Sequence, residues 1–243
     1  MLGLPDGIRA CLFDMDGVLT ETATVHARAW KQMFDEYLHG REGANFKPFT
    51  QDDYDEYVDG KPRYDGVKSF LASRDIELPQ GTPGDPPSTE SVDGLGNRKN
   101  ELVLELIHAE GVTAYPGSVK YVRAVRDAGL RTAVVSSSAN CAEVLQAAGI
   151  EDLFEVRVDG HVVEERHLPG KPAPDTFLQA AKLLGMTAAE SAVFEDALSG
   201  VEAGRAGNFG FVVGVDRVGQ AEALKAHGAD IVVKDLGELL DRP

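Results

Sequence analysis

Two aspartates stand close together directly after an apolar stretch near the start of the chain. The run 8–13 stops at Asp14, and Asp16 and Gly17 follow it. A short apolar run of this kind is typical of a buried strand that ends in a loop. On such a loop one carboxylate can attack phosphorus while its neighbour transfers the proton of the entering or leaving oxygen. The same Asp-x-Asp-Gly pattern also occurs in solvated turns, so the pair alone leaves both interpretations open.

A second pair of carboxylates points to a metal site. Glu195 and Asp196 follow the apolar run 191–194, which has the pattern of another buried strand. Open α/β sheets bind their ligands at the carboxyl ends of their strands. Gathered carboxylates repel one another unless a cation holds them, and such hard oxygen ligands suit Mg²⁺, which also bridges to substrate phosphate. We therefore expect a Mg²⁺ ion there, shielding an anionic nucleophile from an anionic phosphoryl group.

Two further residues could bind that phosphoryl group. Ser136 follows the predicted strand 131–135, and its hydroxyl and the backbone amides of a helix start could bind phosphate oxygens. Lys171 precedes a predicted helix at 174–184 and could place its charge on the phosphate and on Asp14. Each residue also has an ordinary structural interpretation, as a helix N-cap for the serine and as a surface charge for the lysine.

Short β-branched or aromatic runs recur along the second half of the chain. They occupy residues 131–135, 191–194, 209–213 and 230–233, and helical patterns separate them. Strands that alternate with helices in this way form βαβ units on a parallel sheet. The expected fold class is therefore α/β.

The alternation of strand and helix patterns is interrupted between the first predicted strand and Tyr115. Apolar residues at helical spacing from Val25 to Leu38 predict an amphipathic helix, and no strand pattern follows it. Residues 78–96 are rich in Pro, Gly, Ser, Thr and Asp, which predicts a mobile surface loop because too little apolar surface is present to pack. A helix resumes at about residues 97–110. We interpret the whole stretch as a separate helical insertion.

Bulk composition excludes several classes of protein. The chain has 243 residues, enough for one full domain and a smaller one, and its net charge of −16 disfavours nucleic-acid or anionic-membrane partners. Cys11 lies in an apolar run, so we expect no disulfide framework linking it to Cys141. No signal-peptide pattern and no run of roughly 18 apolar residues is present, which predicts a cytoplasmic protein.

Four motifs, taken in order, resemble those of the haloacid dehalogenase superfamily. They are residues 13–18 (Phe-Asp-Met-Asp-Gly-Val), 135–137 (Val-Ser-Ser), 171–175 (Lys-Pro-Ala-Pro-Asp), and Glu195-Asp196 with Gly200. The resemblance covers nearly the whole chain. It implies a Rossmann-like parallel-sheet core, residues 1–23 and 111–243, with an inserted α-helical cap of the C1 type, residues 24–110, that acts as a mobile lid.

Carried over residue by residue, this resemblance implies a role for each motif residue. Asp14 would be the nucleophile that becomes an aspartyl phosphate, and Asp16 would be the general acid/base. Ser136 and Lys171 would hold the transferring phosphoryl group. Mg²⁺ would be held by the Asp14 carboxylate, the Asp16 backbone carbonyl, Glu195 and Asp196.

The first motif and the residues after it resemble the β-phosphoglucomutase family more closely, through positions 14–23 and then His26, Arg28, Ala29, Trp30 and Lys31. In that family a histidine at the His26 position couples substrate binding to lid closure. The cap also supplies an arginine and a lysine to the sugar phosphate. The resemblance gives Arg63, in the loop from Gly60, for the non-transferring phosphate, and Lys99 as the cap lysine. Further substrate contacts are implied at Thr22, Ser138 and Asn140.

Three features depart from that family's pattern. Ala139 stands where a basic residue is common, Gly66 stands where a serine is expected, and a Pro/Gly-rich loop at 79–96 lengthens the cap. These departures leave the identity of the sugar open, but they do not touch the phosphoryl chemistry.

Three functions remain in competition. The first is a mutase that converts β-glucose 1-phosphate to glucose 6-phosphate through a bisphosphate, under a lid that excludes water. The second is a phosphatase that acts on hexose phosphates or related metabolites. The third is an inactive binding module, which the filled catalytic positions disfavour. His26, Arg63 and Lys99 favour the mutase, and we expect a monomer whose partner is a small sugar phosphate.

Overall fold

The structure is a computed structural model that describes residues 2–242. The chain divides into two compact units. One unit comprises the described residues up to Glu21 together with those from Val112 onward, and the other is Thr22–Gly111. The sequence predicts an insertion at 24–110, and each unit is described separately below.

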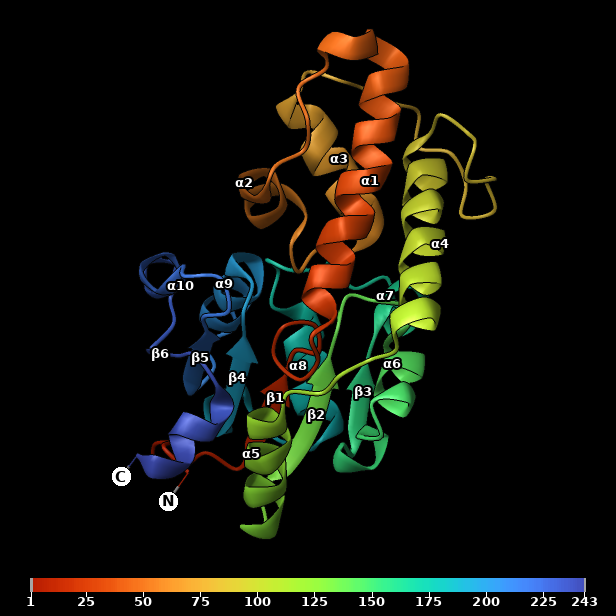
Figure 1. Ribbon diagram of the computed structural model, residues 1–243. Helices are drawn as coiled ribbons and strands as arrows, with labels where there is room; N and C mark the ends of the chain where they lie inside the picture. The colour runs from red at the N-terminus through yellow and green to blue at the C-terminus, as the bar shows by residue number, and fades with distance from the viewer. Residues whose placement is uncertain (1, 243) are drawn as a thin grey trace. The chain divides into compact units, whose positions relative to one another are not determined.

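The first unit is built on a parallel sheet (Figure 1). Within residues 2–242 its six strands are β1 (Ala10–Phe13), β2 (Arg131–Val135), β3 (Val156–Val158), β4 (Ser191–Glu195), β5 (Phe211–Val215) and β6 (Ile231–Val233). Their spatial order is β3-β2-β1-β4-β5-β6, and every neighbouring pair is parallel. The order reverses beside β1, and such a switch point is where open α/β sheets bind ligands.

Helices cover both faces of this sheet. They are α5 (Pro116–Asp127), α6 (Cys141–Ala147), α7 (Gly160–Arg166), α8 (Asp175–Leu183), α9 (Leu198–Ala206) and α10 (Ala221–His227), with shorter turns η3 (Glu151–Leu153), η4 (Ala188–Glu190) and η5 (Leu236–Asp241). Successive strand residues point to opposite faces. Leu12 therefore packs with Phe177 of α8 on one face, while Phe13 meets Tyr121 of α5 on the other, with ring centroids 6.4 Å apart.

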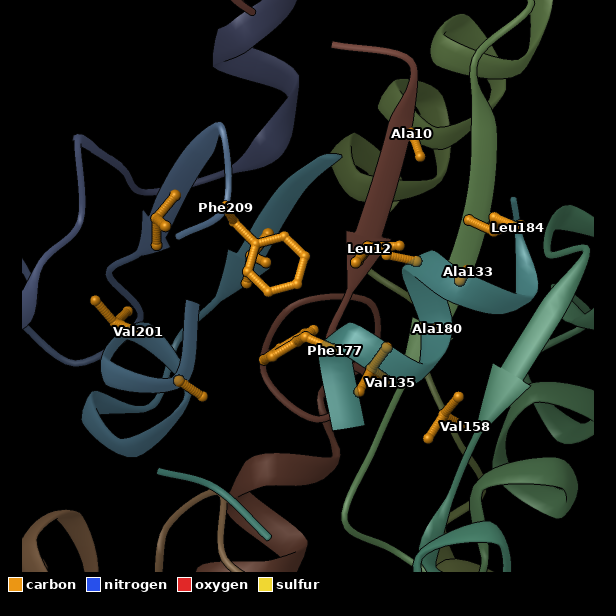
Figure 2. Close-up of a cluster of buried hydrophobic side chains, with 14 of the residues drawn as sticks. Ala10, Leu12, Ala133, Val135, Val158, Phe177, Ala180, Leu184, Val201 and Phe209 are labelled. Carbon is orange, nitrogen blue, oxygen red and sulfur yellow. The ribbon is translucent and has the colours of Figure 1, made fainter. Parts of the chain in front are cut away.

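Figure 2 shows the core on the α8 face, where side chains of β1, β2 and β3 gather beside that helix. Leu12, Val135, Val158, Phe177 and Ala180 are at most 1% exposed. Apolar burial contributes about 25 cal/mol per Å² of surface removed from water. Because helices pack on both faces of the sheet, the carboxyl ends of its strands are held in fixed positions relative to one another.

Two strand predictions need correction. The run predicted at 209–213 is wrong by two residues, because Asn208 adopts a left-handed φ of 54° and Phe209 turns into the core before β5 begins. Strand β3 was not predicted, since three residues at the sheet edge carry no readable periodicity. Cys11 and Cys141 are buried and free, in agreement with the expectation of no disulfide framework.

The second unit is helical throughout its described secondary structure. Its elements are α1 (Thr22–Glu42), η1 (Gly43–Asn45), α2 (Gln51–Asp53), η2 (Tyr54–Val58), α3 (Arg63–Ser73) and α4 (Val92–Glu110). Aromatic rings form its core: the Phe34 centroid lies 5.2 Å from that of Trp30 and 4.1 Å from that of Phe70. These rings join α1 to α3, and α4 packs along α1 (Figure 1). Within residues 2–242, every helix is too short or too polar to span a bilayer.

The predicted loop at 78–96 is wrong in its last five residues. Helix α4 begins at Val92, because the Ser91 hydroxyl accepts a hydrogen bond from the Gly94 amide at 3.0 Å and caps the helix. The loop that remains, residues 78–91, is called the cap loop below. The sequence did not predict the helix start at Val92, because the glycines at 94 and 96 have a low helix propensity.

Candidate active site

Three carboxylates meet at the carboxyl edge of the sheet. Asp14 follows β1, Glu195 ends β4, and Asp196 follows it. Because β1 and β4 are parallel neighbours with Phe13 opposite Phe194, the residues that follow them come together. One oxygen from each carboxylate lies within 4.8 Å of the others, and all three residues are at most 7% exposed. This all-oxygen donor set fits a hard divalent cation such as Mg²⁺.

Lys171 lies against this cluster. Its Nζ donates to Glu195 Oε1 at 2.5 Å and to the Val135 carbonyl at 3.4 Å, and it also pairs with the Asp14 carboxylate. Burial alone would lower the pKa of Lys171, but the two carboxylates raise it above its ordinary value. The side chain therefore carries a full positive charge within the site, not on the surface.

Burial and charged neighbours together determine the pKa of Asp14. Burial raises its pKa well above the ordinary value, and the charges of Glu195 and Asp16 add to this effect, while Lys171 opposes it. A cation among the carboxylates would favour the ionised form, which is the form able to act as a nucleophile.

Two glycines allow the carboxylates to pack closely against the backbone. Gly17 has φ +82°, and a Cβ there would lie 1.7 Å from Asp196 Oδ2. At Gly200 an added Cβ would lie 1.8 Å from Glu195 Oε1. Any larger residue at either position would displace a carboxylate, which gives a physical reason for both glycines in the motifs.

The loop after β2 brings the serines to the same edge. Ser136 is buried and directly follows Val135, whose carbonyl accepts from Lys171. Its hydroxyl accepts from the Ser138 amide at 3.1 Å, and the Ser138 hydroxyl accepts from the Asn140 amide at 3.1 Å. The N-cap interpretation of Ser136 is wrong, because α6 begins only at Cys141. For the same reason the amides beside Ser136 belong to a turn and not to a helix start.

A partly buried arginine that sequence reasoning missed, Arg217, holds the loop that carries Asp16. Arg217 donates from Nε to the Gly17 carbonyl at 2.8 Å and from a terminal nitrogen to the Lys234 carbonyl at 2.7 Å. Its guanidinium lies 3.6 Å from the ring centroid of Tyr115. The Arg217 side chain thus ties the loop after β1 to the segments that follow β5 and β6.

Ser118 supports the same loop from α5. Its hydroxyl donates to the Val18 carbonyl at 2.6 Å, and the Gly17 amide closes the turn onto the Thr20 carbonyl at 2.8 Å. The only sequence signal for Ser118 or for Arg217 is a polar residue near a predicted strand or helix end, which is too common to single them out.

The remaining candidates lie in the second unit. Lys99 is 6% exposed, and its Nζ lies 2.7 Å from His26 Nδ1 and 4.9 Å from the Trp30 ring centroid. His26 is therefore neither simply packed nor solvated. Thr22 is buried at the first position of α1, and Gly60 has φ +70° in the turn before α3.

Arg63 is the first residue of α3, and it belongs to a separate network in the second unit. It donates to the Tyr64 hydroxyl at 2.8 Å. Gly66, which replaces an expected serine, lies on the same helix. A Cβ at Gly66 would come within 3.1 Å of the Trp30 ring, so the indole packs against the α3 backbone.

Comparisons with known proteins show what this chain is similar to. Residues 8–208 match the model of the haloacid dehalogenase-like hydrolases. A β-phosphoglucomutase of Mycobacterium bovis is 57% identical over 99% of this chain and 94% of its own length, and one of Bacillus subtilis is 30% identical over 96% and 92%. A solved β-phosphoglucomutase structure from Clostridium difficile superposes with a TM-score of 0.76 at 26% identity, over 96% of this chain and 93% of that one. The chain therefore belongs to the haloacid dehalogenase superfamily and, within it, to the β-phosphoglucomutase-like proteins.

Proposed function

We propose that this protein is a Mg²⁺-dependent β-phosphoglucomutase that converts β-glucose 1-phosphate to glucose 6-phosphate through the 1,6-bisphosphate. The observation that carries the proposal is the buried group in which Lys171 bonds both Asp14 and Glu195 beside Asp196. The extensive identity to mycobacterial proteins of that name supports the choice of reaction.

Asp14 is the proposed nucleophile. One of its carboxylate oxygens forms a bond to phosphorus as the bond from phosphorus to the sugar oxygen breaks, which leaves an aspartyl phosphate. The Lys171 ammonium neutralises charge beside both the nucleophile and the transferring group, and Ser136 offers a hydroxyl at the same edge. In the second half-reaction a sugar hydroxyl attacks phosphorus, and Asp14 is released as a carboxylate.

Asp16 is the proposed general acid/base. It gives a proton to the departing sugar oxygen and takes one from the sugar hydroxyl that attacks in the return step. Its loop is held by Arg217 and Ser118, which act on the backbone at Gly17 and Val18. Rigid support of this kind keeps the carboxyl within reach of the oxygen it serves.

A divalent cation fits the donor set of Asp14, Glu195 and Asp196, to which we add the Asp16 backbone carbonyl as a ligand. When bound, Mg²⁺ would neutralise negative charge on the phosphoryl group and hold it in place. Glu195 is also fixed by Lys171 and by the Ala197 amide, which donates to Oε2 at 2.9 Å.

The second unit supplies the proposed contacts to the rest of the sugar phosphate. The buried ammonium group of Lys99 lies next to the imidazole of His26, and this arrangement suits an anionic ligand. Arg63 can present its planar guanidinium to the non-transferring phosphate. Further contacts are proposed at Thr22 and Gly60 of this unit, and at Ser138 and Asn140 of the first unit.

Phosphorus NMR of the turnover mixture tests the proposal directly. The protein is incubated with Mg²⁺, β-glucose 1-phosphate and a trace of glucose 1,6-bisphosphate, and glucose 6-phosphate and free phosphate are followed together. We expect glucose 6-phosphate without comparable free phosphate, and no conversion with the Asp14→Asn variant. Free phosphate as the main product would reject the mutase.

A sugar-phosphate phosphatase is the second candidate function. The matched family model is one of hydrolases, and Ala139, Gly66 and the cap loop depart from the mutase pattern. Both reactions use the same aspartyl phosphate and differ in whether water reaches it. The ratio of free phosphate to glucose 6-phosphate therefore distinguishes the two candidates in a single experiment.

A further inference from the structure

The cap loop is braced by its own side chains. The Asp85 carboxylate accepts from the Thr82 hydroxyl at 2.8 Å and from the Ser91 hydroxyl at 2.7 Å. These hydrogen bonds, that from Ser91 first, lower the pKa of Asp85, so it accepts as a carboxylate at neutral pH. At the end of the loop, the amides of Val92 and Asp93 bond the Pro79 and Gln80 carbonyls, each at 3.0 Å. The loop is therefore a closed, internally bonded structure.

This loop determines the orientation of the Asn97 amide. Asn97 Nδ2 donates to two of its carbonyls, that of Pro83 at 3.1 Å and that of Asp85 at 3.0 Å. Both N–H groups of the amide are used, and Oδ1 faces away from the loop. A flipped amide would set an oxygen against two carbonyl oxygens, so only one orientation is compatible with the loop.

The next link is Tyr64. Its hydroxyl donates to Asn97 Oδ1 at 2.9 Å, because that oxygen can only accept. Because the single hydroxyl proton is used in that hydrogen bond, the hydroxyl oxygen acts as the acceptor toward Arg63, whose terminal nitrogen lies 2.8 Å away. Each bond in the series thus sets the direction of the next, from the loop carbonyls to the guanidinium.

Packing reinforces this chain of hydrogen bonds. The Arg63 guanidinium lies 4.8 Å from the centroid of the Tyr64 ring. A Cβ on Gly96 would lie 2.6 Å from Tyr64 Cδ1, so the missing side chain allows the ring to rest on α4. Tyr64 uses one of the five N–H groups of Arg63, and the planar fork can still offer a pair to a phosphate.

We propose that the cap loop positions Arg63 through Asn97 and Tyr64, which makes both of them positioning residues for the non-transferring phosphate. This inference rests on the proposed function, because it requires Arg63 to bind that phosphate. We call this series of hydrogen bonds, from the cap loop through Asn97 and Tyr64 to Arg63, the relay. A guanidinium held in place loses less conformational freedom on binding, so the relay increases affinity for the sugar phosphate. The loop that lengthens the second unit thereby acquires a role in substrate binding.

A double-mutant cycle in the full-length protein tests the relay. Mutase kcat/KM for β-glucose 1-phosphate is measured for Tyr64→Phe, Arg63→Ala and the double variant, with hydrolysis of 4-nitrophenyl phosphate as a reaction that lacks a second phosphate. We expect Tyr64→Phe to lower mutase kcat/KM about fivefold to tenfold, mainly through KM, and to spare the hydrolysis. In the Arg63→Ala background the same change should cost nothing further.

Two more variants separate positioning from general destabilisation. Asn97→Asp keeps an acceptor for Tyr64 but places a carboxylate against the loop carbonyls, so it should reproduce the loss in KM. Tyr57→Phe removes a hydroxyl from the same unit outside the relay and should leave both activities unchanged. An unaltered KM in both Tyr64→Phe and Asn97→Asp, or an additive loss in the double variant, would overturn the relay.

The NMR signal of the Arg63 Nε–Hε group distinguishes failure of the relay from failure of the proposed function. The signal is assigned by its loss in Arg63→Ala and should shift or broaden in Tyr64→Phe and Asn97→Asp, but not in Tyr57→Phe. If the wild type lacks mutase activity while the signal still responds, the proposed function fails and the positioning of Arg63 stands. If mutase activity is present and the signal does not respond, the relay fails.

Discussion

Lys99 Nζ and His26 Nδ1 lie 2.7 Å apart within the second unit and join α4 to α1. A lysine ammonium can only donate, so His26 Nδ1 is the acceptor in this contact. The imidazole thereby orients the Lys99 charge, and the Trp30 ring contacts the same ammonium.

His26→Ala should therefore lower mutase kcat/KM about tenfold, because Lys99 loses the acceptor that orients it. Hydrolysis of 4-nitrophenyl phosphate should be spared. His26→Gln retains an acceptor and should keep more of the mutase activity than the alanine variant. Steady-state kinetics on both substrates measure this, and equal losses in the two assays would contradict a role in binding the sugar phosphate.

Gly17→Ala should destroy activity through Asp196. Its Cβ would overlap the Asp196 carboxylate, and its φ of +82° strains any residue with a side chain by about 1–2 kcal/mol. Gly219→Ala is the matched control, because its φ is +87° and a Cβ there meets nothing within 4 Å. Thermal unfolding should show similar destabilisation of both variants, whereas only Gly17→Ala should lose turnover and stabilisation by Mg²⁺. Comparable losses of turnover would show that backbone strain alone is responsible.

Lys171→Met should abolish turnover and destabilise the fold by about 3–5 kcal/mol, because it leaves buried carboxylates uncompensated. Lys171 opposes the effect of burial on the pKa of Asp14, so this pKa rises further in the variant. A pKa raised in the folded state means that the folded state binds the proton more tightly than the unfolded state. The loss of unfolding free energy caused by Lys171→Met should therefore become smaller as pH falls from neutral toward the range in which carboxyl groups take up protons.

Urea unfolding of the wild type and of Lys171→Met across pH measures this dependence. Adding Glu195→Gln to Lys171→Met should recover stability without activity, since it removes one of the unpaired charges. A penalty that is independent of pH would place the cause in lost packing instead of electrostatics.

Arg217→Ala should lower kcat about tenfold for mutase and phosphatase reactions alike, because the loop that carries Asp16 loses its anchor. The control is Arg205→Ala, which removes hydrogen bonds to the Gly228 carbonyl and to Asp230 far along the chain from that loop. It should change the unfolding midpoint but not kcat. Unchanged kcat in a folded Arg217→Ala protein would remove Arg217 from the mechanism.

Removal of divalent cations with EDTA should abolish turnover, and added Mg²⁺ should restore it. Asp196→Asn should raise the Mg²⁺ concentration needed for half-maximal activity, because one charged oxygen ligand becomes neutral. Activity titrations with Mg²⁺ measure the shift. Full activity in EDTA would reject the metal-dependent mechanism.

The sequence by itself determined the parallel α/β sheet and the meeting of Asp14 with Glu195. Both follow from local patterns, since apolar runs of strand length alternate with helices, and residues that follow neighbouring parallel strands must share one edge of the sheet. Motif order then identified the superfamily, because the same few residue types recur in a fixed succession at those edges.

Only the tertiary structure decided which distant residues hold the site in place. Arg217 reaches the carbonyl of Gly17, 200 positions away, and Asn97 reaches Tyr64, 33 positions away. The start of α4 at Val92 likewise depends on one hydroxyl, that of Ser91. Such contacts are set by the paths of loops and the directions of single side chains. Neither leaves a periodic trace in the sequence, because each involves one residue and not a repeated face of a helix or strand.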